Sequence, residues 1–250
     1  MTQIQTDKIE EVVNNGENQA VPKHPVVPRT LVRERILEEA QGRLLRVGEE
    51  FEGGFAVLEK YDRTVSIFGS ARLPQDHPAA LKAYEVAAHL ARAGYAVATG
   101  GGNGIMEAAN HGAYDAGGGS IGINIQLPME QNLNPYTTDH FTFKHFFARK
   151  VLLTLGSHAY IYCPGGFGTM DELFEIITLM QTGKIPKAPI ILMGDNFWKP
   201  LDSFIRHVLL DGYNVISPED LDLYTITEDI DEIVHIIESH APTHAAEQQG

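Results

Sequence analysis

The sequence predicts an α/β fold in which a mostly parallel sheet is covered by helices on both faces. Short runs of β-branched and apolar residues alternate with longer segments in which apolar residues recur at helical spacing. Several of the short runs end in glycine-rich turns that lead into the next helical segment, an order typical of βαβ units. The 250-residue chain suits one large domain with a sizeable core, and we find no internal repeat in it.

Each element follows from one of these runs. Runs rich in β-branched residues predict strands, and Ala- and Leu-rich runs predict helices. Glycines after the helical runs, such as Gly94 and Gly117–Gly119, predict where those helices end. In chain order we expect a strand at Thr64–Gly69, a helix at Pro78–Arg92, a strand at Tyr95–Thr99, a helix at Ile105–Ala116, a strand at Ser120–Gln126, a short strand at Phe141–Phe143, a helix at Lys144–Leu155, a strand at His158–Cys163, a helix at Thr169–Gln181, a strand at Pro189–Met193, a helix at Trp198–Leu210 and a last helix at Glu228–Ser239.

The two ends of the chain differ from this core. Residues 1–28 are polar and contain several prolines, which predicts a disordered tail, and residues 241–250 predict a second flexible tail. Residues 29–60 carry apolar side chains at helical spacing among Arg and Glu. This pattern predicts an N-terminal helical extension, which we expect Gly53-Gly54 to interrupt near its end. Residues 61–240 form the predicted α/β domain.

The composition excludes several classes of protein. A net charge of −14 repels nucleic acids and anionic membrane surfaces, so any bound phosphate must be held locally. The single cysteine, Cys163, excludes an internal disulfide framework and is typical of a reducing compartment. We find no signal peptide and no run of 18 apolar residues. A cytoplasmic protein that binds neither nucleic acid nor membrane is therefore expected.

Three turns at predicted strand ends carry the functional signal. They are Gly69-Ser70-Ala71, Gly100–Gly104 and Pro164–Thr169. In an open parallel sheet, ligands bind at the carboxyl ends of the strands. Glycine lets the backbone approach an anion, and a helix N-terminus adds a favourable potential. Three such turns on one edge predict a ligand that carries a phosphate.

Familiar motifs do not explain these turns. The P-loop pattern G-x-x-x-x-G-K-[ST] is absent, and Ile105 occupies the last glycine position of G-x-G-x-x-G, which disfavours a dinucleotide cofactor. The eleven histidines show no tight metal-ligand spacing. We therefore expect neither a cofactor nor a metal.

Glu172 has two interpretations that the residues leave open. Thr169 and Glu172 stand in the T-x-x-E spacing of a capping box, which explains both structurally. Alternatively, a carboxylate on the first turn after the glycine loop reaches a sugar whose phosphate the loop holds. Cleavage of an N-glycosidic bond passes through a cationic sugar, which a carboxylate stabilises, and it needs an activated water.

Arg149 is the candidate cation. Helical spacing places Arg149 on one face with Phe146, Leu152 and Leu153, which predicts a half-buried side chain. An isolated arginine in this pattern is more often a surface residue. Beside an anion site, its rigid guanidinium suits a phosphate or a carboxylate.

These residues resemble those of the LONELY GUY family, cytokinin-activating phosphoribohydrolases long mislabelled as lysine decarboxylases. Pro164–Glu172 matches the family signature P-G-G-x-G-T-x-x-E, and Phe147–Lys150 is similar to its arginine motif. Gly100–Met106 and Phe68–Ser70 resemble its other two loops. The resemblance spans residues 62–240, and the N-terminal helical segment is similar to that of the longer family members.

The resemblance implies a Rossmann-like homo-oligomer, a dimer or a larger assembly of dimers such as a hexamer, that releases a free base and ribose 5-phosphate. It assigns catalysis to Arg149 and Glu172. The substrate and phosphate contacts that it implies are Ser70, Gly101, Gly102, Gly104, Lys150, Gly165, Gly166, Gly168 and Thr169. The chain departs from the family in Asn103-Gly104, where Pro-Gly is usual, and in Glu107 on the next helix. These changes concern substrate choice.

Other functions stay open at this point. A nucleotide-binding module without catalysis would keep the glycine loops but would not require Arg149 and Glu172 together. A decarboxylase would need pyridoxal phosphate on a lysine, and no lysine lies within a phosphate-type loop. Cys163 is expected to be a small core residue, and Tyr136 an ordinary loop aromatic. Whether the substrate is a cytokinin nucleotide, AMP or another purine nucleotide is not decided by the sequence.

Overall fold

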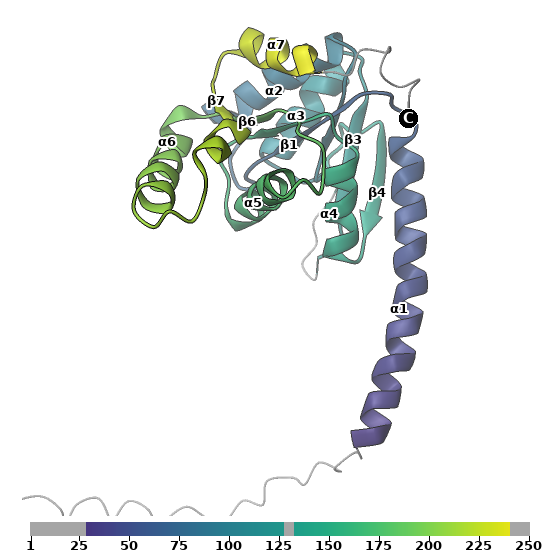
Figure 1. The fold of residues 1–250 in the computed structure, drawn as a ribbon. Helices are drawn as coiled ribbons and strands as arrows, with labels where there is room; N and C mark the ends of the chain where they lie inside the picture. Colours follow the sequence, from purple (N-terminus) through teal and green to yellow (C-terminus); the bar gives the residue numbers. More distant parts are fainter. Residues whose placement is uncertain (1–28, 128–132, 241–250) are drawn as a thin grey trace, which may run out of the picture. The chain divides into compact units, whose positions relative to one another are not determined.

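A computed structural model describes residues 29–127 and 133–240 of the chain (Figure 1). The tails predicted at 1–28 and 241–250 lie outside these described residues. Contacts divide the chain into two units between Leu45 and Arg46, so the described residues from Arg46 onward belong to one unit. The elements are α1 (Arg29–Leu58), β1 (Thr64–Phe68), α2 (Pro78–Arg92), β2 (Ala96–Thr99), α3 (Ile105–Asp115), β3 (Ser120–Ile125), β4 (Asp139–Phe143), α4 (Phe146–Leu155), β5 (Ala159–Tyr162), α5 (Phe167–Gln181), β6 (Ile190–Leu192), α6 (Asp195–Phe204), the π-helical turn η1 (Ile205–Leu210), the 3₁₀ helix η2 (Pro218–Leu223), β7 (Thr225–Ile226) and α7 (Ile230–His240).

The sheet confirms the predicted fold class. Seven strands pair in the order β4-β3-β2-β1-β5-β6-β7, and every neighbouring pair is parallel. The chain moves outward in one direction from β1 to β4 and in the other from β5 to β7. The crevice where the direction reverses, between β1 and β5, is where ligands bind in folds of this class.

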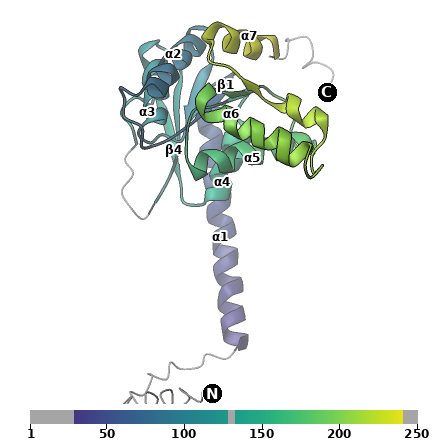
Figure 2. The ribbon, with the colours of Figure 1, turned by 90° about the vertical axis from the view of Figure 1, so that its left-hand side faces the viewer.

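Helices cover both faces of the sheet, as predicted (Figures 1 and 2). Helices α2, α3 and α7 share one apolar core with the sheet. Helices α4, α5 and α6 share the other, together with Val47, Val57 and Leu58 of α1. Strands β1, β2, β3, β5 and β6 are buried on both faces, with side chains such as Ile67 and Ile161 fully enclosed, whereas the edge strands β4 and β7 are partly exposed. Burial on both faces explains why these strands are continuous apolar runs rather than alternating patterns.

Helix α1 corrects one prediction. Gly53-Gly54 does not interrupt the helix, which continues to Leu58. A Cβ atom at Gly53 would collide with the ring of Phe141, and one at Gly54 would lie 2.6 Å from the ring of Phe143. The two glycines therefore let the helix approach β4 closely, and this packing outweighs their low helix propensity.

Smaller differences appear after β6. The predicted helix at Trp198–Leu210 begins earlier, at Asp195, and changes to a π-helical turn at Ile205. The two-residue strand β7 and the 3₁₀ helix before it were not predicted, because neither is long enough to show a period. Across residues 29–127 and 133–240, no helix is long and apolar enough to cross a membrane.

Candidate functional site

The three glycine-rich turns meet at one edge of the sheet. The amide of Ser70 donates to the carbonyl of Pro164 at 3.0 Å, and the amide of Ile105 donates to the carbonyl of Ser70 at 3.0 Å. A Cβ atom at Gly104, which has φ +66°, would collide with the Ser70 carbonyl. Glycine at this position therefore allows the turns after β1 and β2 to touch.

A cleft of about 730 Å³ opens between these turns and helix α4. It brings together seven of the predicted site residues. Those seven are Ser70, Arg149, Gly165, Gly166, Gly168, Thr169 and Glu172. The cleft is also lined by Gly100 and Met106, which belong to the loop that the sequence singled out, and by Arg72, which it did not. The signal for Arg72 was adjacency, because it lies two residues after Ser70.

Helix α5 presents its N-terminus to the cleft. The helix begins at Phe167, with Gly166 as N-cap and no side-chain cap. Thr169 is thus the third helical residue, so the capping-box interpretation of Thr169 and Glu172 is wrong. Cβ atoms at Gly166 and Gly168 would meet nothing within 4 Å, so packing within the described chain does not require glycine there. The exposed amides of this first turn suit an anion.

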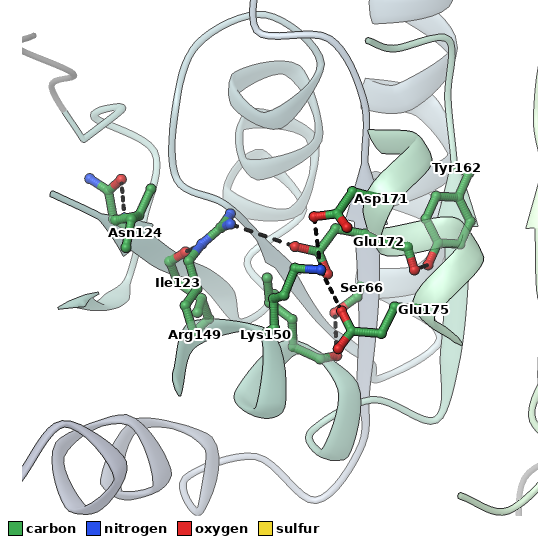
Figure 3. A network of polar contacts seen from close by, with 11 residues as sticks. Ser66, Ile123, Asn124, Arg149, Lys150, Tyr162, Asp171, Glu172 and Glu175 are labelled. Carbon is green, nitrogen blue, oxygen red and sulfur yellow. Dashed lines mark hydrogen bonds and ion pairs between the residues drawn. The ribbon is translucent and has the colours of Figure 1, made fainter. Parts of the chain in front are cut away.

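Glu172 is the most unusual group in the cleft (Figure 3). The residue is only 5% exposed, yet its Oε2 has no hydrogen-bond partner among the described residues. Its Oε1 lies 3.8 Å from Nη1 of Arg149. Burial raises the pKa of Glu172 to about 7, although the charges of Arg149 and Lys150 oppose this shift. A buried carboxyl group poised near neutral pH is typical of a catalytic residue.

Arg149 is held firmly beside Glu172. Its Nε donates to the carbonyl of Ile123 at 2.8 Å, which ties α4 to β3. A Cβ atom at Gly100 would lie 2.5 Å from Nη2 of Arg149, so the missing side chain makes room for the guanidinium. Burial lowers the pKa of Arg149, and the carboxylate of Glu172 opposes that shift. The sequence predicted that Phe146, Leu152 and Leu153 share one face of the helix with Arg149. Leu152 and Leu153 are buried, but Phe146 is exposed, so the prediction is wrong for Phe146.

Lys150 is directed elsewhere (Figure 3). Its Nζ lies 2.8 Å from Asp171 and 2.7 Å from Glu175, both on α5. Partial burial opposes its charge, but the hydrogen bonds to Asp171 and Glu175 raise the pKa of Lys150 overall. The side chain is not among those that line the cleft. Lys150 therefore joins α4 to α5 rather than facing a ligand.

The remaining predicted glycines also lie behind the cleft. Gly101, Gly102 and Gly104 are buried and are not among its lining residues. The amide of Gly101 donates to Oγ1 of Thr99 at 2.9 Å, and the carbonyl of Gly102 accepts from Nδ2 of Asn134 at 3.1 Å. These contacts shape the turn that carries Gly100. The family departures at Asn103 and Glu107 likewise lie outside the cleft lining.

The other candidates from the sequence stay outside the cleft lining. Cys163 is fully buried, and burial raises its pKa to about 12, so its thiol is a core group. Tyr136 stacks on His111 with ring centroids 3.8 Å apart. Among the described residues that line the cleft, none is a lysine. A pyridoxal phosphate Schiff base therefore has no attachment point there, and the site does not fit that cofactor.

The fold and the cleft define a Rossmann-like α/β protein with an anion-binding helix terminus beside a buried acid. A family model described as "Possible lysine decarboxylase" matches residues 106–237. The chain is 32% identical over 146 residues to the cytokinin riboside 5′-monophosphate phosphoribohydrolase LOG3 of Arabidopsis thaliana, covering 58% of this chain and 67% of that one. This chain belongs to that family, the LONELY GUY family.

Solved structures agree on the fold. The X-ray structure of TM1055, a structural genomics target, is 27% identical, with a TM-score of 0.54, and the match covers 71% of this chain and 99% of that one. The molybdenum cofactor binding protein of the phototrophic bacterium Rippkaea orientalis is 25% identical, with a TM-score of 0.52 and coverage of 71% and 96%. The fold is thus shared with a protein named for binding the molybdenum cofactor.

Proposed function

We propose that this protein is an enzyme that hydrolyses the N-glycosidic bond of purine nucleoside 5′-monophosphates. The products are the free base and ribose 5-phosphate. The observation that carries the proposal is the buried carboxyl group of Glu172, whose Oε2 lacks a partner within the described chain, beside Arg149 in the cleft. A buried polar atom without a partner is costly, so its retention is best explained by a ligand or a reaction.

The cleft divides the work of binding between backbone and side chains. The amides of the α5 first turn hold the 5′-phosphate, and the open space at Gly166 and Gly168 admits it. Arg72 and Arg149 are the cations among the described residues that line the cleft. Arg149 is paired with Glu172, whereas Arg72 has no ion pair within the described residues, so its charge adds to the binding of the phosphate. The protein as a whole is acidic, so this local positive potential is what makes phosphate binding favourable.

The reaction needs Glu172 in its ionised form. As the bond between C1′ and the base nitrogen breaks, its electron pair leaves with the base and C1′ becomes cationic. The carboxylate stabilises this cation and orients a water whose oxygen bonds to C1′, while the water's proton ends on the base. Arg149 holds the carboxylate in place and, as a cation that lines the cleft, also contributes to nucleotide binding. Because the pKa of Glu172 is about 7, kcat/KM should rise with pH up to about pH 7 and then level off.

The choice of base follows from the apolar part of the cleft. Met106, Ile125 and Phe146 line it together with the polar groups. These side chains suit a purine and an apolar substituent on it. The relative from Arabidopsis thaliana is named for cytokinin riboside 5′-monophosphate. We extend the proposal to adenine and cytokinin nucleotides, with no cofactor.

The proposal includes assembly of several copies in the cytoplasm. Helices α4 and α5 expose four phenylalanines, of which Phe146 and Phe167 line the cleft. These are Phe146, Phe147, Phe167 and Phe174, with Phe167 95% exposed. Exposed aromatic side chains in one area are typical of protein interfaces. A homo-oligomer, either a dimer or a larger assembly of dimers such as a hexamer, would cover them beside the site.

The alternative function is nucleotide binding without turnover. It is favoured by the fold similarity to a protein named for binding the molybdenum cofactor. In that case the glycine turn would hold a phosphate-bearing ligand, and Glu172 would form a hydrogen bond to it in its protonated state. Binding of AMP with no release of adenine would be the result that this alternative predicts.

The experiment is to incubate the protein with AMP, isopentenyl-AMP and adenosine and to measure the released base by chromatography. We expect base and ribose 5-phosphate in equal amounts from the two nucleotides, and far less release from adenosine, which lacks the phosphate. The ratio of the two nucleotide rates identifies the preferred base. Absence of base from both nucleotides, with binding measured by calorimetry, would establish the alternative.

A further inference from the structure

The C-terminal part of α1 supplies a buried acid to the start of helix α4. Glu50 is 7% exposed. Its Oε1 accepts from the amide of Lys144 and its Oε2 accepts from the amide of His145, both at 3.2 Å. Its Oε1 also lies 3.0 Å from Nδ1 of His145. One carboxyl group thus contacts three donor or ring nitrogen atoms at a single helix end.

This contact replaces a cap that α4 lacks. The N-cap residue of α4 is His145, and its side chain makes no capping hydrogen bond. The amides at a helix start need partners, and a negative charge there is favourable because of the helix dipole. Glu50, which lies on α1, provides both the hydrogen-bond acceptor and the negative charge. The start of α4 is therefore fixed by a residue nearly one hundred positions earlier in the sequence.

The rest of this part of α1 fits closely against α4 and β4. A Cβ atom at Gly54 would lie 3.0 Å from Leu152 of α4. At the other end of α4, a Cβ atom at Gly156 would collide with Leu58 of α1. These approaches leave little space for α4 to move relative to residues 46–58. Those residues belong to the same compact unit as the sheet.

Helix α4 carries Arg149 into the site. The amide of Arg149 donates to the carbonyl of His145 at 3.2 Å, so the residue that Glu50 contacts lies one turn before Arg149. The guanidinium reaches both the carbonyl of Ile123 and the carboxyl group of Glu172. A small shift of α4 would change both distances. Displacements of about 1 Å at such groups have large effects on catalysis.

We propose that Glu50 is a positioning residue for Arg149. The inference rests on the proposed function for its kinetic effect, but the contacts that carry it are independent of that function. It also assigns residues 46–58 to the structure that supports the cleft. Loss of Glu50 should therefore act through Arg149 rather than through a general loss of folding.

The first test compares Glu50→Gln and Glu50→Ala with Glu49→Gln, a matched control at an exposed neighbour. We expect Glu50→Ala to lower kcat for AMP about tenfold. Glu50→Gln should retain part of the activity, since its amide oxygen still accepts one backbone hydrogen bond. Glu49→Gln should match the wild type. Circular dichroism identifies any variant that does not fold, and Glu50→Gln keeps the test open if Glu50→Ala fails to fold.

A double-mutant cycle with Arg149→Ala separates positioning from general destabilisation. AMP affinity is measured by calorimetry for the wild type, Glu50→Gln, Arg149→Ala and the double variant. We expect Glu50→Gln to weaken binding in the wild-type background and to have no further effect without Arg149. Equal weakening in both backgrounds, or none in either, would overturn the proposal. Because the cycle measures affinity rather than turnover, it tests the positioning role of Glu50 even if the wild type releases no base. Absence of base release would refute only the proposed function.

Discussion

Two hollows flank the Ser70–Gly165 junction at the carboxyl edge of the sheet, and they differ in chemistry rather than in size. The cleft at the start of α5 measures about 730 Å³, and the hollow beside α2 and α6 measures about 570 Å³. Both are lined by Ser70 and Gly165. The second hollow contains Lys82 and Glu228, which form an ion pair at 3.2 Å and are each about 40% exposed.

The charged pair of the second hollow is fully partnered, whereas the cleft contains polar groups that have no partner within the described chain. Oε1 of Glu228 accepts from the amide of Asp195 at 2.9 Å and so caps α6. In the cleft, the start of α5 has no side-chain cap, and Oε2 of Glu172 has no partner within the described chain. The partnered ion pair thus indicates a structural hollow, whereas an unpartnered buried carboxyl group that lines a cleft indicates a site of chemistry.

The largest expected effect distinguishes the two hollows directly. Glu172→Gln should reduce kcat by about 10³-fold or more, because the amide cannot supply the negative charge that stabilises the sugar cation. The matched variant Glu228→Gln should change kcat less than about twofold. Both are measured as adenine release from AMP. Comparable losses in the two variants would remove the distinction between the hollows.

Arg149→Lys should have the next largest effect. Lysine cannot reproduce the contacts of the planar guanidinium with both Ile123 and Glu172, so we expect kcat to fall about 10²-fold. Lys82→Arg, a basic exchange in the second hollow, provides the control and should leave kcat unchanged. A fully active Arg149→Lys enzyme would show that Arg149 contributes only a charge.

Arg72→Ala tests phosphate binding in the cleft. We expect KM for AMP to rise about tenfold, because a charge-assisted contact to the phosphate is lost. The slow hydrolysis of adenosine should not change, since adenosine has no phosphate. Lys82→Ala should leave KM for AMP as it is. An equal effect of Arg72→Ala on both substrates would place this arginine at the base or the ribose.

The smallest expected effect is on stability, and it concerns Glu172 alone. The pKa of Glu172 is about 7 in the folded protein and near the ordinary value of 4.5 in the unfolded chain. The contribution of Glu172 to the free energy of unfolding is therefore fully present below pH 4.5, and it is lost as the pH rises to about 7. Between pH 4.5 and pH 7.5, the free energy of unfolding of the wild type should fall relative to Glu172→Gln by up to about 3 kcal/mol. Urea titrations across this range measure it, and parallel curves would contradict the shifted pKa.

Much of this fold was predictable because it depends on local patterns. The βα alternation and the glycine turns located six of the seven strands and the edge at which the cleft lies. The two residues of β7 were missed, because their pairing with β6 is a tertiary effect. The capping box failed for a related reason. The glycine loop lets α5 begin at Phe167, so the T-x-x-E spacing falls within the helix and has no cap to make.

The candidate site was predictable in its motif but not in its orientation. Helical spacing could not show that Lys150 turns toward Asp171 while Arg149 turns toward Glu172, since this depends on how α4 packs against α5. Glu50 could not be found in this way, because no local pattern connects α1 to the start of α4. Contacts between residues far apart in the sequence decide both cases.

The most direct test of the account is a crystal structure of the Glu172→Gln variant with AMP bound. We predict the phosphate on the amides of Gly166–Thr169, the ribose C1′ beside the substituted side chain at position 172, and the base toward Met106. The second hollow should contain no nucleotide. A nucleotide between His77 and Phe197, with the cleft unoccupied, would contradict the central claim that the unpartnered buried acid marks the site.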